Sequence, residues 1–173
     1  MNERSLKLPE NLERAGFVLA AGMLLRTGDA CAIEEAVVPE GVTGLANGCF
    51  AGCRELVRAS LPATLREVGV GAFQDCVMLR EVFLPAGMTR LRKATFSGCR
   101  ALEHLEIPAG VASIGEWAFR GCENLRSVTV PESVQELCAE VFLACPKLTL
   151  LAGEGSAGAA HARQFGIPLQ ILE

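Results

Sequence analysis

The chain has 173 residues, about the length of one domain, and half of them are hydrophobic, so a sizeable core can form. The formal net charge of −4 is spread along the sequence without a run of like charges, which argues against a nucleic-acid binder. No apolar stretch reaches the roughly 18 residues needed to span a membrane, so we expect no transmembrane segment.

The first candidate element is the apolar segment 16–25, which has two interpretations. Basic residues precede it and a small-residue motif, Ala30–Cys31–Ala32, follows it, as in a signal peptide. However, glutamates lie among the basic residues, and Arg26 and Asp29 lie ahead of the motif. We therefore favour a structural role for the N-terminal segment 1–38, as a cap on the repeats that follow.

Residues 39–153 contain five repeats of 23 residues. Each repeat begins with a proline, and a phenylalanine, a cysteine and a leucine recur with the same spacing. The members are Pro39, Pro62, Pro85, Pro108 and Pro131; Phe50, Phe73, Phe96, Phe119 and Phe142; Cys53, Cys76, Cys99, Cys122 and Cys145; and Leu56, Leu79, Leu102, Leu125 and Leu148. A unit of this size cannot bury its apolar side chains alone, so successive coils must stack with equivalent residues in contact. The spacing therefore predicts a solenoid in which the five phenylalanines form one continuous internal file.

Each coil is expected to contain one short strand that ends at the next proline, as at residues 102–107, and equivalent strands should pair in parallel. A second apolar pair, such as Val111 and Ile114, covers the opposite wall. The segment 118–122 then turns the chain back as a short 3₁₀ or α turn. The side chains that point outward from the strands form three columns, which end at Thr149, Leu150 and Ala152.

Residues 154–173 are expected to cap the C-terminal end. Ser156 is a suitable N-cap for an alanine-rich helix at 157–165, and Gly166 is a suitable stop. Residues 167–172 then supply a covering strand. Such a cap is needed because a bare solenoid end exposes apolar surface and strand edges, which favours polymerisation.

The repeat pattern, I/L-P-x-x-V/L-x-x-I/L-x-x-x-A-F-x-x-C-x-x-L-x-x-V/L, resembles the BspA-type leucine-rich repeat family over residues 39–153. The fourth repeat, IPAGVASIGEWAFRGCENLRSVTV, is nearly a consensus copy. The resemblance implies a right-handed leucine-rich-repeat solenoid of parallel β strands and short 3₁₀ or α turns, with a hairpin cap within 17–38 and a helix-and-strand C-terminal cap. It also implies surface-exposed or secreted bacterial proteins that bind other proteins, often in adhesion.

The chain has eight cysteines. We expect the five in the repeat column to be reduced and buried, because an evenly repeated residue fills an evenly repeated packing slot. Cys31, Cys49 and Cys138 lie outside the column. No CxxC pair or histidine cluster accompanies them, so we expect no metal and no cofactor. Unpaired thiols fit a reducing compartment, whereas the resemblance implies the cell surface, and the location stays open between the two.

Motifs that carry catalysis are missing from the sequence. There is no P-loop, zinc-protease or nucleophile-elbow pattern, and His104 and His161 are both expected at the surface. The enzymatic hypothesis that remains is thiol chemistry at Cys49 or Cys138. We favour a protein that is not an enzyme.

The expected partner-binding surface is the outward face of the strands, which is the concave face of leucine-rich repeats. Its candidate residues are Arg58, Arg80, Glu81, Phe83, Glu103, His104, Glu106 and Arg126. The alternating charges have a second interpretation, as cross-strand pairs that hold the sheet in register. Phe83 is the best candidate anchor because it is an outward aromatic residue among polar ones, although lateral packing on its neighbours would also explain it.

The size of this face limits the affinity that it can provide alone. Five strands give a face of roughly 400 Å², about half of what one partner contributes to a standard interface. A tightly bound protein partner, which the sequence does not identify, would also have to use the edges or caps, or the chain would have to self-associate. The leading hypothesis is a bacterial surface module for protein binding, and an intracellular adaptor or scaffold of the same fold is the alternative.

Overall fold

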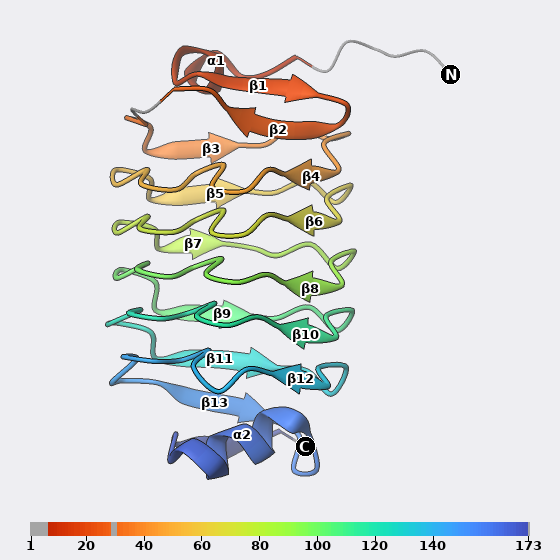
Figure 1. Ribbon diagram of the computed structural model, residues 1–173, viewed down its shortest axis with the longest axis vertical. Coiled ribbons are helices and arrows are strands. Elements are labelled where there is room, and N and C mark those ends of the chain that lie inside the picture. The colour runs from red at the N-terminus through yellow and green to blue at the C-terminus, as the bar shows by residue number, and fades with distance from the viewer. Residues whose placement is uncertain (1–6, 29–30, 173) are drawn as a thin grey trace.

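The computed structural model describes residues 7–28 and 31–172 and shows a stack of coils with a cap at each end (Figure 1). The N-terminal cap begins with a short helix, α1 (Glu10–Arg14), which the sequence analysis did not anticipate. An antiparallel hairpin of β1 (Phe17–Ala20) and β2 (Met23–Arg26) follows. Its turn, Ala21–Gly22, has φ values of 48° and 77°, and positive φ at both positions is what a tight two-residue hairpin requires. The apolar segment 16–25 thus forms the expected hairpin.

The repeats that follow place strands on two walls. The first wall continues from β2 and contains β4 (Gly44–Leu45), β6 (Glu67–Val68), β8 (Arg90–Leu91), β10 (Ser113–Ile114) and β12 (Glu136–Leu137). The second wall contains β3 (Glu35–Val37), β5 (Arg58–Ser60), β7 (Glu81–Val82), β9 (His104–Glu106), β11 (Ser127–Val130), β13 (Thr149–Ala152) and β14 (Leu169–Ile171). Every strand pair between successive coils is parallel, as predicted. We call the outward surface of the second wall the strand face.

The turn expected at 118–122 is present as separate hydrogen-bonded turns rather than as a helix. The Cys122 N–H donates to the Phe119 carbonyl three residues earlier, at 3.2 Å. Between such bonds, amides of the same segment donate to the next coil, as Phe119 does to the Val141 carbonyl at 3.0 Å. The turn is therefore a third ladder that links successive coils.

The predicted phenylalanine file forms the centre of the core. Neighbouring rings from Phe50 to Phe142 lie 5.2–5.7 Å apart between centroids, with planes 5–14° from parallel. Phe17 of the hairpin extends the file at 4.8 Å from Phe50. At the other end, His161 packs edge-on against Phe142 at 5.8 Å. The prediction of a surface position for His161 is wrong, because this side chain closes the file and is only 6% exposed.

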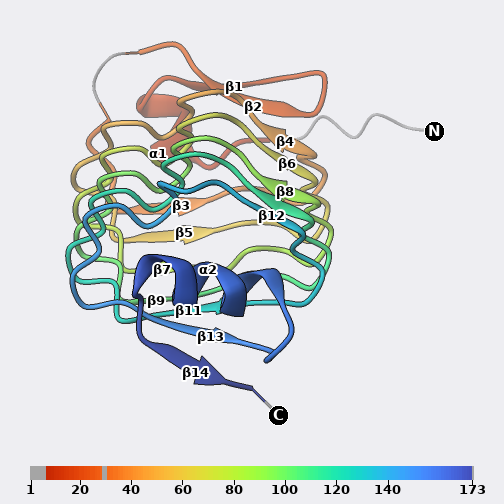
Figure 2. The same cartoon turned by 60° about the horizontal axis from the view of Figure 1, so that its bottom comes forward.

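The C-terminal cap agrees with its prediction in each element. Helix α2 (Ala157–Phe165) begins at Ser156, whose hydroxyl accepts from the Ala159 amide, and ends at Gly166 in the left-handed conformation. The helix packs so closely on the last coils that a Cβ at Gly158 would lie 2.9 Å from the Val130 side chain. Strand β14 then pairs in parallel with β13, and Figure 2 shows helix and strand together covering the end of the stack.

The register of β13 differs from the regular spacing by one residue. Ser127 pairs with Thr149 and Val128 with Leu150, so the partners are 22 residues apart rather than 23. A shift of one residue exchanges the two faces of a strand. The prediction that Leu150 and Ala152 point outward is therefore wrong, and both are fully buried.

Both walls are interrupted at the same place, between the coil 62–84 and the coil 85–107. Among the described strands, β7 does not pair with β9 and β6 does not pair with β8. The turn ladder continues there, since Phe73 N–H donates to the Thr95 carbonyl at 2.9 Å. We call this coil boundary the seam.

The seam has no hydroxyl link between coils. Thr64 and Ser133 each donate a hydroxyl hydrogen bond to a carbonyl of the preceding coil, whereas the equivalent residue is a glycine at the seam, Gly87, and also at the next boundary, Gly110, where the strands do pair. The guanidinium of Arg66 lies over this glycine instead, 2.2 Å from where a Cβ would be, and donates to the carbonyls of Ala63 and Leu65. The Arg66 side chain, which is hydrogen-bonded within its own coil, thus occupies the space where a hydroxyl side chain would link the two coils.

Candidate partner-binding surface

Several of the candidate charges on the strand face form cross-strand pairs. Arg58 Nε lies 2.7 Å from a Glu81 carboxylate oxygen, and its Nη1 lies 4.0 Å from Glu35. The hydrogen bond and the charge of Glu81 raise the pKa of Arg58, and the guanidinium in turn lowers the pKa of Glu81. Because these side chains are exposed, the pairs add little stability. They tie β3, β5 and β7 into one block.

A second block lies on the other side of the seam. Arg126 Nε is 3.3 Å from a Glu103 carboxylate oxygen, and His104 Nδ1 is 2.7 Å from the Ser127 hydroxyl. Both contacts join the coil of β9 to the coil of β11. The cross-strand interpretation therefore accounts for these residues as it does for Arg58 and Glu81.

Side-chain pairing stops at the seam. In the described part of the strand face, no ion pair or hydrogen bond joins Arg80 to Glu103 or Glu81 to His104. Arg80 and Glu106 have no salt-bridge partner there. The two charged blocks thus face each other across a strip without polar side-chain links.

A hollow of about 640 Å³ lies along this strip. Phe83 forms part of its wall and is 77% exposed, the highest value among the large hydrophobic side chains that the structure describes as exposed. The remaining lining residues come from both sides of the seam: Val82, Leu84, Ala86, His104, Leu105, Glu106, Pro108, Ala109, Ser127 and Thr129. The structure therefore brings Phe83, His104 and Glu106 together and leaves the other five candidates outside the hollow.

The backbone beside the hollow also lacks hydrogen bonds that equivalent positions have. The amides of Val38 and Ile107 each donate to the strand of the next coil, at 3.0 and 3.1 Å. The corresponding bonds from Leu61 to the Phe83 carbonyl and from Leu84 to the Glu106 carbonyl are absent. Strand β7 ends at Val82, so Phe83 and Leu84 pair neither with the preceding coil nor with the next one. The N–H groups of Leu61 and Leu84 and the carbonyls of Phe83 and Glu106 are thereby left without these partners.

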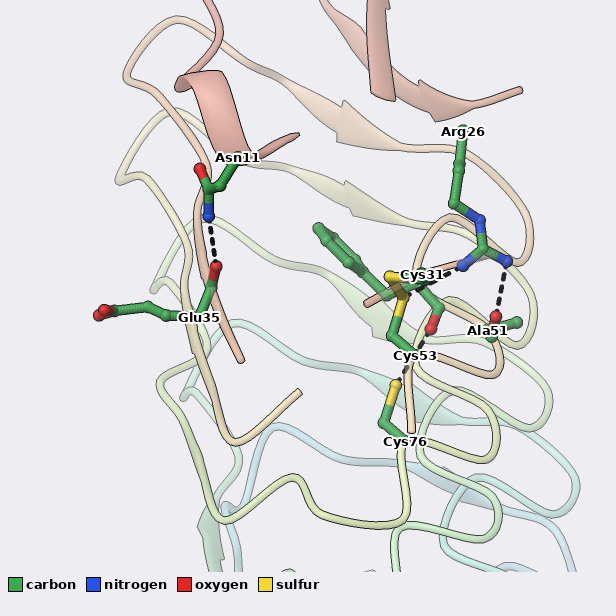
Figure 3. The surroundings of a disulfide bond; sticks show 8 residues. Asn11, Arg26, Cys31, Glu35, Ala51, Cys53 and Cys76 are labelled. Atoms are coloured by element: carbon green, nitrogen blue, oxygen red, sulfur yellow. Dashed lines mark hydrogen bonds between the residues drawn. A yellow bond between two sulfur atoms is a disulfide. The ribbon is translucent and has the colours of Figure 1, made fainter. Parts of the chain in front are cut away.

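A disulfide bond lies at the N-terminal end, between Cys31 and Cys53 (Figure 3). Cys53 belongs to the repeat column, so the prediction that all five column cysteines are reduced is wrong. The reason is that the first cysteine of the column has a neighbour from the cap, Cys31, 22 residues earlier. Arg26 holds the same corner by donating to Cys53 Sγ at 3.1 Å and to the Ala51 carbonyl at 2.6 Å (Figure 3).

The other column cysteines are free thiols that link coils. The S–H of Cys76 donates to the Phe50 carbonyl at 3.1 Å, and Cys99 and Cys122 repeat the bond one and two coils later. Burial raises the pKa of Cys76 to about 12. Cys76, Cys99 and Cys122 are thus buried packing residues with very little thiolate at neutral pH. Cys145, the last cysteine of the column, is only partly buried, so the prediction of burial does not hold fully for it.

The two cysteines considered for thiol chemistry differ in accessibility. Cys49 is buried and donates to the Leu24 carbonyl at 3.3 Å, and burial raises its pKa to about 12. Cys138 is an exposed free thiol. Neither has a histidine among its hydrogen-bond partners in the described residues, which leaves the thiol-enzyme hypothesis without an activated nucleophile.

Trp117 packs on the edge of its coil. Lys93 Nζ lies 4.1 Å from its ring centroid and Arg120 lies on the ring at 5.4 Å. The indole N–H donates to Glu140, and Lys93 also pairs with Glu116 at 2.7 Å. Its neighbours therefore account for Trp117 without a ligand.

Within residues 7–28 and 31–172, no group of three or more His, Cys, Asp or Glu side chains is arranged to hold a metal ion. The helices of these ranges are also too short or too polar for a bilayer crossing.

Solved structures of other proteins resemble this fold. A leucine rich cell surface protein from Faecalibacterium prausnitzii superimposes with a TM-score of 0.75 at 28% identity, over 84% of this chain and 39% of that one. A leucine-rich repeat protein from Bacteroides ovatus gives 0.68 at 25%, over 84% and 43%. The leucine rich repeat protein of T. pallidum gives 0.69 at 26%, over 87% and 70%. The chain thus spans less than half the length of the first two proteins.

No protein among the curated sequences compared with this chain matches it. The family model described as BspA type leucine rich repeat region matches residues 29–149 in 6 copies. This range begins before Pro39, so the family model counts one copy more than the five regular repeats. Together with the parallel walls and the phenylalanine file, the match shows that the chain belongs to the BspA-type leucine-rich repeat family.

Proposed function

We propose that the chain is a non-catalytic protein-interaction module that binds a protein partner on the strand face, with Phe83 as the anchor. The observation that carries the proposal is the 77% exposure of this phenylalanine beside a hollow. Aromatic residues in pockets supply much of the binding energy in protein interfaces. Most of the other charged candidates are already paired within the sheet, so their contribution is to frame the site.

We further propose a location outside the cytoplasm. The Cys31–Cys53 disulfide supports it, because disulfides persist mainly in oxidising compartments. One structural relative is named a cell surface protein, and it shares 28% identity with this chain. Thiol labelling of the protein taken from its native cells and denatured without reductant tests this: labelling of the six free cysteines supports the proposal, and labelling of all eight contradicts it.

The test of the binding function is affinity capture with three immobilised proteins: the wild-type chain, Phe83→Ala and Leu143→Ala. Leu143 is a matched control, since it is also an exposed apolar residue, at 47%, but lies on a turn away from the strand face. We expect a partner that the wild type and Leu143→Ala retain and that Phe83→Ala loses. Equal retention by all three proteins would contradict the proposal. The melting temperatures should agree within about 2 °C, because neither side chain is buried.

A further inference from the structure

We propose that the hollow at the seam binds an arginine side chain of the protein partner, stacked on Phe83 and paired with Glu106. This assignment rests on the proposed function and names the chemistry of the group that fills the site. It follows from three features of the hollow: its unpaired carboxylate, its further hydrogen-bond acceptors and its apolar lining.

Glu106 carries the charge. It is exposed, lies in the lining of the hollow and forms no ion pair with any described residue. The lining contains no lysine or arginine at all. The neighbouring carboxylates of Glu81 and Glu103 are already satisfied by Arg58 and Arg126, on the outer sides of the two blocks. Of these three neighbouring carboxylates on the strand face, Glu106 alone has no cation partner among the described residues.

The hollow also offers hydrogen-bond acceptors besides the Glu106 carboxylate. The Glu106 carbonyl receives no bond from the Leu84 amide, and the Thr129 hydroxyl can accept as well as donate, whereas the Ser127 hydroxyl already contacts His104. A guanidinium offers five N–H donors in one plane, so it can serve a carboxylate and further acceptors together. An ammonium group has only three donors and no plane, which favours arginine over lysine.

Much of the remaining lining is apolar. Phe83, Leu84, Pro108 and Ala109 supply it, and Phe83 is largely exposed. A guanidinium stacks well on an aromatic ring and its aliphatic stem packs on apolar surface. The hollow is larger than one side chain and falls in the range of small-ligand pockets, so it also admits residues that flank the arginine.

The probe for the test is N-acetyl-L-arginine methylamide, titrated into the ¹⁵N-labelled full chain and followed by NMR. The citrulline analogue, which has nearly the same shape but no charge, is the ligand control. We expect arginine to shift amides from Phe83 to Ala109 and citrulline to bind at least about tenfold more weakly, because a hydrogen bond to a charged group contributes about 1.5–3 kcal/mol. Equal binding of the two probes, or no shifts in this segment, would overturn the assignment.

The matched protein variants are Glu106→Gln and Glu136→Gln. Both residues are exposed strand glutamates without an ion-pair partner in the described residues, but Glu136 lies in β12 on the other wall. We expect Glu106→Gln to weaken binding of the arginine probe about tenfold and Glu136→Gln to leave it unchanged. An equal affinity of both variants for the probe would contradict the assignment.

The captured partner separates the two proposals. A partner that requires Phe83 but binds Glu106→Gln in full would preserve the proposed function and refute the arginine site. A partner that Phe83→Ala still retains would refute the proposed function itself. Loss of the partner in both variants, with retention by Glu136→Gln, supports both.

Discussion

Phe73 and Phe96 stack with their ring centroids 5.4 Å apart and their planes 8° from parallel. They belong to coils on opposite sides of the seam, where both walls lack strand pairing. Aromatic stacking, the turn ladder, the Cys99 hydrogen bond to the Phe73 carbonyl and the Arg92–Glu67 ion pair therefore join the two coils in the absence of strand hydrogen bonds.

Replacement of Phe96 by alanine should be severely destabilising. Its ring is fully buried and stacks on Phe73 and Phe119, so its loss leaves a cavity that the neighbouring coils cannot fill. We expect the free energy of unfolding to fall by about 3–5 kcal/mol, measured by chemical denaturation. Phe83→Ala is the matched control, and a loss as small as that of the control would contradict the buried file.

The disulfide should contribute measurably to stability. The Cys31–Cys53 bond closes a short loop between the cap and the first cysteine of the column, and such a bond restricts the unfolded chain. We expect Cys31→Ala to lower the free energy of unfolding by about 3 kcal/mol under oxidising conditions. Cys138→Ala removes an exposed free thiol instead and should have little effect. Stability that does not change on addition of a reductant would count against the bond.

The stability of the C-terminal cap should depend on pH through His161. Burial lowers the pKa of His161 below its usual value of 6.5, so the folded protein resists the proton that the unfolded chain accepts. The stability that the neutral ring provides is present above that value and is lost as the pH falls from there toward the lowered pKa. We expect the wild type to lose more stability than His161→Gln between about pH 7.5 and pH 5. Parallel curves for the two proteins would exclude the effect.

The seam should be visible in amide hydrogen exchange. Leu84 and Ile107 occupy equivalent positions, but only the Ile107 amide has an acceptor in the next coil, the Thr129 carbonyl at 3.1 Å. We expect the Leu84 amide to exchange at least about tenfold faster than the Ile107 amide. A tenfold difference corresponds to about 1.4 kcal/mol of local protection. NMR exchange measures both amides in one sample, and equal rates would mean that the walls continue through the seam in solution.

Regular spacing made most of the fold predictable. Because the same slot recurs every 23 residues, the phenylalanine file and the parallel walls follow from the sequence alone, and the N-cap and glycine stop signals predict the helix from Ser156 to Gly166. The interruption of both walls at the seam falls within the regular spacing and was not predictable from it. The other errors occur where the spacing ends. Strand β13 is displaced by one residue, and His161 and Cys31 reach the core from the caps, which have no repeat to read.

The candidate site was predictable only in part. Alternation along the strand places Phe83 outward, but nothing in that pattern reveals that pairing stops beside it. Gly87 stands where Thr64 and Ser133 link coils, but Gly110 stands at the same position of a boundary where the strands pair, so the glycine alone does not mark the seam. What distinguishes Gly87 is the Arg66 side chain that lies over it, and that requires coordinates.

The uniform coil from Pro108 to Val130 has a consequence for the dimensions of the molecule. Its phenylalanine, Phe119, meets nearly identical surfaces above and below, at 5.7 and 5.4 Å. A duplicate of these 23 residues, inserted before Pro131, would find compatible neighbours on both sides and lengthen the protein by about 4.8 Å. The length of the protein can thus be changed in steps of one coil. Insertion or deletion of whole repeats alters the distance between the two caps without changing either cap.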